Sequence, residues 1–303
     1  MKIQNSDFAA FIMSYERPEV LMKTLKRIEE QTYPPSFILI IDNSESDRVQ
    51  TKIKSLKREE IKYYRVGYNS GPAGAANIGL DKLFKMGYRW IYWGDDDNPP
   101  RDQYEFEQLF KKLESLLKMD TKIGAISGKG GNLSLKTGRI RSLSNKELEM
   151  APVVEVDSVP GGHTLIVNAN LVKEGVLPDK KLFFGFEELD FSLLARSKGF
   201  KLFVDSENWL QIRKRAKHYD PKFRPRASGF GNLSLLQREY YSTRNLLFIF
   251  FKNRYYQAFA FTLIKTLIKT GYGFRYGLIY GLANFRLQWK ALYHFFLSRS
   301  GKE

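Results

Sequence analysis

Short apolar runs alternate with segments of helical periodicity through the first two thirds of the chain. The runs that have the length and continuity of buried strands are residues 8–13, 37–41, 62–66, 90–93, 123–127, 164–167 and 201–204. Apolar residues recur every three or four positions in the segments between them, which predicts helices over about 18–31, 51–60, 75–86, 101–118, 169–175 and 187–198. This alternation predicts an α/β fold with a Rossmann-like, mostly parallel sheet flanked by helices on both faces.

The composition changes after about residue 237. Tyr, Phe, Leu, Lys and Arg dominate the remainder, and residues 245–303 contain nine Lys or Arg but a single carboxylate, Glu303. The longest uncharged apolar stretches here, 255–264 and 276–285, have ten residues each, whereas a membrane-spanning helix needs about 20. We therefore expect an α/β domain over 1–240 and an amphipathic helical tail over 241–303 that contacts a membrane surface or another copy of the chain.

Net charge and cysteine content restrict the class of partner. The 303 residues include no cysteine and carry a formal charge of +16. The cysteine count rules out disulfides, thiolate metal sites and a cysteine nucleophile, and it fits a reducing, cytoplasmic setting. The positive charge indicates anionic partners, such as nucleic acid, acidic lipid or phosphorylated substrates. Residues 213–226 are strongly basic and rich in turn formers, which predicts a mobile loop.

Three consecutive carboxylates, Asp95, Asp96 and Asp97, follow the apolar run at 90–93. Adjacent carboxylates repel one another unless a cation lies between them, so the cluster suits a divalent metal. It falls where a central strand of an α/β sheet ends, which is the usual place for a ligand crevice. His218, in the basic segment, is a candidate further ligand. A solvated acidic turn is the alternative interpretation.

Two polar segments follow other strands. Asp42, after the run at 37–41, can accept hydrogen bonds from a nucleobase or a ribose, although an Asx turn is the commoner role of Asp-Asn-Ser. Residues 69–77 form a glycine-containing loop before a helix, where backbone amides can approach a phosphate. This loop is neither a Walker loop nor a dinucleotide fingerprint, because it lacks Gly-Lys-Ser/Thr and its glycines are wrongly spaced.

A second acidic cluster, Glu187, Glu188 and Asp190, opens the helix at 187–198 after an aromatic run at 182–186 that we expect to be a buried strand. Favourable interaction with the helix dipole is one interpretation. The other is a general base whose pKa is raised by packing against the phenylalanines. His163, which follows two glycines before the run at 164–167, is a candidate to point into the crevice.

Taken in order, these motifs resemble the family 2 glycosyltransferases of the GT-A fold, from residue 8 into the tail. The tail and its Tyr-Tyr…Arg-Asn motif look most like bacterial rhamnosyltransferases and galactofuranosyltransferases of surface-polysaccharide assembly. The matching residues are Met13-Ser14-Tyr15-Glu16-Arg17-Pro18, Asp42-Asn43-Ser44, 69–79, Asp95-Asp96-Asp97, Gly161-Gly162, Glu187-Glu188-Leu189-Asp190 and Tyr240-Tyr241-Ser242-Thr243-Arg244-Asn245.

The resemblance implies an inverting transfer from a nucleotide-sugar, for example UDP-galactofuranose or dTDP-rhamnose, with Mn²⁺ or Mg²⁺ as cofactor. It implies that Asp95 and Asp97 bind the metal, with His218 as the candidate further ligand, and that Glu188 is the catalytic base. The donor contacts that it implies are Tyr15, Arg17, Asp42, Asn69, Gly74, Asn77, Asp95 and Asp96. The acceptor contacts that it implies are Gly162, His163, Glu187 and Asp190.

The acceptor implied by the resemblance is a glycan or a polyprenyl-diphosphate-linked hydroxyl. The expected location is cytoplasmic and peripheral, at the inner face of the cell membrane, with an anionic membrane surface as a partner and no nucleic acid. A sugar-phosphate nucleotidyltransferase is the alternative enzyme, but it would carry Arg and Lys in a glycine-rich loop after the first strand. A basic nucleic-acid-binding domain explains the charge and the aromatics, but it predicts no acidic cluster at a strand end.

Overall fold

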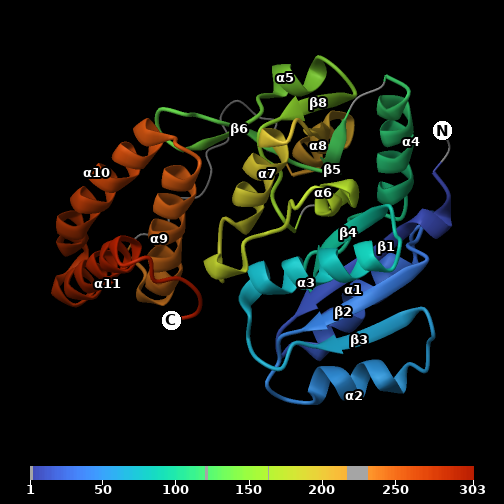
Figure 1. Cartoon of the computed structure of the whole chain (residues 1–303), viewed down its shortest axis with the longest axis horizontal. Helices are drawn as coiled ribbons and strands as arrows, with labels where there is room; N and C mark the ends of the chain where they lie inside the picture. The colour runs from blue at the N-terminus through green and yellow to red at the C-terminus, as the bar shows by residue number, and fades with distance from the viewer. Residues whose placement is uncertain (1–2, 120–121, 163, 217–230) are drawn as a thin grey trace.

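An eight-stranded mixed sheet forms the centre of the computed structural model, which describes residues 3–119, 122–162, 164–216 and 231–303 (Figure 1). The strand order is β3-β2-β1-β4-β9-β5-β10-β8. The strands β1 to β4 are parallel, β10 is parallel to β5, and β9 and β8 run antiparallel to their neighbours. The bounds are β1 Phe8–Ser14, β2 Phe37–Asp42, β3 Ile61–Arg65, β4 Trp90–Asp95, β5 Ile123–Ser127, β8 Val153–Val156, β9 Leu165–Asn168 and β10 Lys201–Asp205.

Helices cover both faces of this sheet, as the continuous apolar strands predict (Figure 1). In β1, Phe11 packs into the core on one face while Phe8 packs into the core on the other, and both are fully buried. The helices of this part are α1 Pro18–Glu29, α2 Arg48–Ser55, α3 Gly71–Lys85, α4 Glu105–Leu117, α5 Asn145–Glu149, α6 Asn170–Lys173, α7 Glu187–Ser197 and α8 Ser206–Arg215. The mostly parallel α/β sheet predicted from the sequence is confirmed.

Three local predictions are wrong. The helix α3 begins at Gly71 rather than at residue 75, because Pro72 fits the first turn and the Phe183 carbonyl accepts the Ala73 amide at 3.2 Å. The aromatic run is not a strand: the 3₁₀ turn η2 Lys180–Leu182 precedes it, and Phe183 and Phe186 have positive φ. Residues 213–215 end the helix α8, whose first turn is capped by Asp205. Residues 217–226 of the predicted loop lie outside the described residues.

The segment between β5 and β8 is more ordered than its composition suggests. A small antiparallel hairpin joins β6 Gly131–Leu133 to β7 Ile140–Ser142, with Thr137 and Gly138 in its connection. The short helix α5 follows, with a capping box in which Ser144 and Glu147 satisfy each other's backbone amides.

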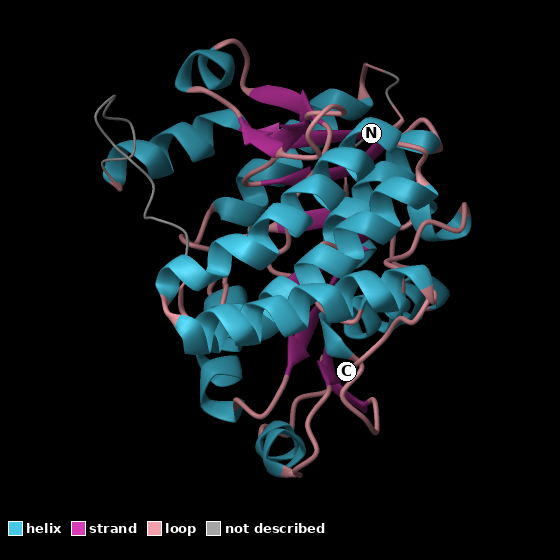
Figure 2. Ribbon diagram, turned by 90° about the vertical axis from the view of Figure 1, so that its left-hand side faces the viewer, coloured by secondary structure: helices cyan, strands magenta, loops and turns pink. Residues whose placement is uncertain are grey.

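The tail folds into three helices, α9 Leu236–Lys252, α10 Tyr256–Tyr272 and α11 Leu278–Phe296, which pack together and face the viewer in Figure 2. The 3₁₀ turns η3 Leu233–Leu235 and η4 Gly273–Tyr276 precede α9 and α11. Buried residues of α9 and α10 join Leu182, Leu189 and Leu193 in one apolar cluster, so the tail packs directly on the α/β part. No helix within the described residues is long and apolar enough to span a membrane.

Candidate active site

A cavity of about 630 Å³ opens at the carboxyl ends of β1, β2 and β4. The parallel register pairs Met13 with Asp95 and Ser14 with Asp42, so polar side chains distant in sequence meet at this edge. We call this space the donor cavity. The residues singled out in the sequence that line it are Tyr15, Arg17, Asn69, Asp95, Asp96, Asp97, Glu187 and Glu188.

Asp96 is the structural centre of the acidic cluster. Its side chain is 1% exposed. It accepts a hydrogen bond from Ser14 Oγ at 3.0 Å and forms an ion pair with Arg17. Thr24 Oγ1 donates to its carbonyl at 2.5 Å. Arg17 also donates to Asp97 Oδ2 at 2.7 Å, so one guanidinium joins the two neighbouring carboxylates. Asp96 therefore holds Arg17 and the turn in place, and its carboxylate is already engaged.

Asp95 and Asp97 also line the cavity, and Asp97 Oδ1 accepts a hydrogen bond from Asn98 Nδ2 at 3.0 Å in addition to its contact with Arg17. Burial first, and then the negative charges of Glu188, Asp97 and Asp96, raise the pKa of Asp95 to about 7. The Asp97 side chain is 42% exposed. A cation between them would remove this repulsion.

The protein side chains supply only part of the ligand set that a hard divalent cation needs. Among the described residues, no group of three or more His, Asp or Glu side chains is placed to hold a metal ion. Two carboxylates are nevertheless a common protein contribution to Mg²⁺ sites in which substrate phosphates complete the coordination. The predicted ligand His218 lies outside the described residues.

Glu188 enters the donor cavity from the first turn of α7. Its Oε1 accepts a hydrogen bond from the Gly161 amide at 3.2 Å, and burial raises its pKa. A Cβ on Gly161 would lie 2.4 Å from that oxygen, and a Cβ on Gly162, where φ is +67°, would lie 3.3 Å from Asp95 Oδ2. The two glycines thus let a loop pass against both carboxylates. His163, the next residue, lies outside the described part.

Glu187 is 4% exposed, and its Oε2 has no hydrogen-bond partner within the described residues. Burial first, and then the charge of Glu188, hold its pKa well above the usual range of a glutamate. A buried, protonated carboxyl group at the cavity wall can donate a hydrogen bond to a bound hydroxyl. Its predicted contact with the acceptor stays a prediction.

Four residues predicted to contact substrates point elsewhere. Asp42 is fully buried and accepts from the Ser44 amide at 2.9 Å and from Tyr63 Oη at 2.7 Å, the Asx turn of the alternative interpretation. Next to it, Asn43 lines the donor cavity.

The other three lie in helices. Gly74 is buried in α3 against the Ser70 side chain. Asn77 donates to the Pro178 carbonyl at 2.8 Å. Asp190 is 1% exposed and accepts two hydrogen bonds from Lys252 Nζ, at 2.9 and 3.0 Å. Asn77 and Asp190 thus join separate segments of the fold, and their expected substrate contacts stay predictions.

The sequence did not reveal what the Arg244-Asn245 pair does. Asn245 Nδ2 donates to the carbonyls of Leu182, Phe184 and Gly185 at 2.9–3.0 Å, and Arg244 donates to the Leu182 carbonyl at 3.0 Å. Both side chains are almost fully buried. They fix the segment 182–185, whose last residues line the donor cavity and lead into Glu187 and Glu188. The signal available in the sequence was an Arg-Asn pair inside an otherwise aromatic helix.

The variant Asn245→Asp keeps the side-chain shape but loses the donors to three carbonyls. We expect the free energy of unfolding to fall by about 2–4 kcal/mol and kcat to fall more than KM changes, because the segment before Glu188 loses its anchor. Asn253→Asp is the matched control, since Asn253 donates only within α9, to the Ile249 carbonyl at 2.8 Å. Thermal denaturation and steady-state kinetics measure both effects. An unchanged kcat in a destabilised Asn245→Asp would show that the anchor is only structural.

Comparison with known proteins places the chain in a family. Residues 10–170, more than half of the chain, match the family described as glycosyl transferase family 2. A mannosyltransferase from Pyrobaculum calidifontis, in complex with GDP-Man and Mn²⁺, is similar in structure, with 10% identity, 97% of this chain and 88% of that chain covered, and a TM-score of 0.54. GalNAc-T7 with UDP, GalNAc and Mn²⁺ is similar over 68% of this chain and 47% of its own, with 14% identity and a TM-score of 0.53.

A curated relative is similar over a shorter stretch. The GalNAc(5)-diNAcBac-PP-undecaprenol beta-1,3-glucosyltransferase of Campylobacter jejuni is 28% identical over 92 residues, which span 29% of each protein. The extent of the family match decides the classification. The chain belongs to glycosyl transferase family 2, and its α/β part has the GT-A fold.

Proposed function

We propose that this protein is a metal-dependent, inverting glycosyltransferase that moves a sugar from a nucleotide-sugar to a hydroxyl of a glycan or lipid-linked acceptor in cell-surface polysaccharide synthesis. The observation that carries the proposal is the donor cavity, where Asp95 and Asp97 share one space with Glu188. Tyr15, Asn43 and Asn69 also line the cavity and are the proposed nucleotide contacts.

In the proposed reaction Asp95 and Asp97 would hold Mn²⁺ or Mg²⁺, which neutralises charge on the leaving diphosphate when bound. The two Mn²⁺-containing structural neighbours support this choice. Arg17 adds a fixed positive charge beside the same carboxylates. Glu188, whose pKa burial raises, takes the proton from the acceptor hydroxyl. The hydroxyl attacks the anomeric carbon from the face opposite the diphosphate, so a single displacement inverts the configuration.

A nucleoside diphosphate together with Mn²⁺ is expected to raise the melting temperature, whereas either alone has little effect. The gain should shrink as the pH falls from 8 to 6, because Asp95, with a pKa of about 7, must lose its proton to bind the metal. The folded-state pKa lies above the unfolded value of about 3.9, so the metal-free protein itself loses stability as the pH rises from about 4 to about 7. Thermal scans with UDP, dTDP and GDP test this. A stabilisation by nucleotide that ignores metal and pH would contradict the proposed site.

The tail helices support the proposed peripheral position at a membrane because they bury several polar side chains while they expose many large apolar ones. The side chains that α10 and α11 turn inward include Thr262, Thr266, Thr270, Asn284 and Gln288. The large apolar side chains that they and η4 expose include Ile264, Ile268, Phe274, Leu278, Ile279, Leu282, Phe285, Trp289 and Phe296. Exposed apolar surface of this extent marks an interaction site.

Cations accompany these exposed apolar residues. Lys265, Arg275 and Arg286 are exposed on the same helices and turn. Each cation near an anionic lipid surface contributes about 1 kcal/mol, and aromatic residues such as Trp289 suit the headgroup region. The relative whose name includes a PP-undecaprenol acceptor supports a lipid-linked acceptor, for which a membrane-surface position is useful.

Liposome co-sedimentation tests the tail. The full chain is expected to bind anionic vesicles in a salt-sensitive manner. The double variant Ile268→Ser/Ile279→Ser is expected to bind at least about tenfold more weakly, because both side chains are mostly exposed and available to the membrane. Point variants are preferable to ending the chain near Asn245, because Leu247 and Phe250 of α9 are core residues. Met119→Ser, equally exposed on the α/β part, is the control. If the full chain stays unbound at low salt, the membrane proposal fails and a contact between copies takes its place.

A further inference from the structure

A second cavity, of about 480 Å³, adjoins the acidic cluster on the side of β5 and α8. It is lined by Asn98 and Arg101 after the acidic cluster, by Lys129 after β5, and by Trp209 and Arg213 of α8. We call it the lateral cavity. Gly162 also lines it, and a Cβ there would lie 3.1 Å from Asn98 Nδ2 and 3.3 Å from Asp95 Oδ2. The glycine loop is therefore the shared wall between this cavity and the carboxylates of the donor cavity.

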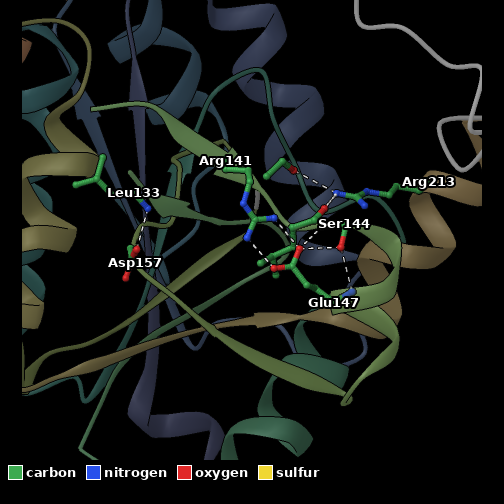
Figure 3. A network of polar contacts seen from close by, with 8 residues as sticks. Leu133, Arg141, Ser144, Glu147, Asp157 and Arg213 are labelled. Atoms are coloured by element: carbon green, nitrogen blue, oxygen red, sulfur yellow. Dashed lines mark hydrogen bonds and ion pairs between the residues drawn. The ribbon is translucent and has the colours of Figure 1, made fainter. Parts of the chain in front are cut away.

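Three cationic side chains line the lateral cavity without a carboxylate partner in the described part of the chain. Arg101 and Lys129 make no ion pair there. Arg213 donates to neutral oxygens only, namely Asn145 Oδ1 at 2.7 Å, the Leu143 carbonyl at 2.6 Å and Ser142 Oγ at 3.2 Å, and Figure 3 shows it reaching toward the segment of Ser144. Its guanidinium also lies over the Trp209 ring, 4.5 Å from the centroid. These contacts orient the Arg213 charge without neutralising it.

The one carboxylate in the cavity wall does not balance these cations. Glu105 is 3% exposed, accepts the Arg101 amide at 2.6 Å, and has a pKa that burial raises. Lys129 experiences the opposite effect: burial first, and then the charges of Arg101 and Arg213, lower its pKa. A bound anion would relieve the repulsion among the three cations. The geometry of the wall, with cations converging from three separate segments, is typical of a site for a phosphate group.

We propose that the lateral cavity binds a phosphate group of the sugar acceptor. The inference rests on the proposed function, because the cavity can serve as an acceptor subsite only if Glu188, on the other side of the glycine loop, is the catalytic base. An acceptor whose phosphate is held by Arg101, Lys129 and Arg213 passes the Gly161-Gly162 wall and presents a hydroxyl on the Glu188 side. The enzyme would then select phosphorylated acceptors, free or lipid-linked, over neutral glycans.

Calorimetric titration of the full chain with inorganic phosphate, at constant ionic strength and in the presence of saturating UDP and Mg²⁺, tests the proposal. We expect phosphate still to bind when the donor cavity is filled, and Lys129→Gln and Arg101→Gln each to weaken that binding at least tenfold. Lys136→Gln, an exposed lysine in the hairpin between β6 and β7, makes the same charge change and should keep the affinity of the unaltered chain. Arg101 is itself exposed, so its variant tests the site even if Lys129→Gln folds poorly.

Complete displacement of phosphate by UDP would overturn the proposal. Equal phosphate affinity of the unaltered chain and the three variants would also overturn it. Titration with geranyl diphosphate and with glucose 1-phosphate then separates the two sources: tighter binding of the first assigns the phosphate to a lipid, and of the second to a free sugar phosphate. Failure of the proposed function gives a different result. In that case UDP, dTDP and GDP fail to bind with metal, while the effect of Lys129→Gln on phosphate is still measured.

Discussion

Replacing Glu188 by Gln is expected to lower kcat by about 10²-fold or more while donor affinity stays close to that of the unaltered chain. Glutamine keeps the shape of the side chain and can still accept a hydrogen bond from the Gly161 amide, now 3.2 Å from Glu188 Oε1. It cannot take the proton of an attacking hydroxyl. The loss should therefore appear in kcat and be nearly independent of pH, whereas the unaltered enzyme gains activity as Glu188 ionises.

Glu59→Gln, an exposed change far along the chain from the donor cavity, is the control for the loss of one carboxylate. Nucleotide titration measures donor binding, and release of nucleoside diphosphate in the presence of acceptor measures kcat. A Glu188→Gln enzyme with normal kcat and weakened donor binding would remove Glu188 from the role of base and place it among the donor contacts.

The second large effect is expected for Asp97→Ala, which should abolish both metal-dependent nucleotide binding and sugar transfer. The fold should survive, because the Asp97 side chain is 42% exposed and its contacts are limited to Arg17 and Asn98. The change removes one of the two proposed metal ligands, leaves Asp95, and frees one arm of Arg17. A single carboxylate is a weak protein contribution to a divalent site.

Asp47→Ala is a matched control for this variant, since Asp47 is an exposed carboxylate paired with an arginine, Arg65, outside the donor cavity. Thermal scans with Mn²⁺ and nucleotide, alongside transfer assays, give the two readouts. Metal-stimulated transfer that persists in Asp97→Ala would exclude Asp97 from the metal site.

The strands that position the site could be predicted from the sequence because each is a continuous apolar run ending in a polar residue. The runs before Asp42 and Asp95 became β2 and β4, and the acidic cluster lies at the expected sheet edge. Tyr15, Arg17 and Glu188, whose roles the family resemblance implied, line the same cavity as that cluster.

What the sequence could not show depends on partners far along the chain. Asp190 has the same chemistry as Glu187 and lies three residues after it, yet Lys252, 62 residues further on, occupies its carboxylate. Asp42 resembles a ligand-binding residue in the sequence, but in the structure its second carboxylate oxygen accepts a hydrogen bond from Tyr63. The aromatic run at 182–186 reads as a strand by composition, but hydrogen bonds from Asn245 hold it as an irregular segment. Local sequence patterns do not predict such long-range contacts.

The most direct test of the central claim is the release of nucleoside diphosphate from a panel of nucleotide-sugars by the purified full chain, measured with Mn²⁺ or Mg²⁺ and again with a chelator. We expect at least one UDP-, dTDP- or GDP-sugar to be hydrolysed slowly with metal, the chelator to stop the reaction, and the released sugar to have the inverted anomeric configuration. Metal-independent release, retention of configuration, or release of pyrophosphate in place of a nucleoside diphosphate would contradict it.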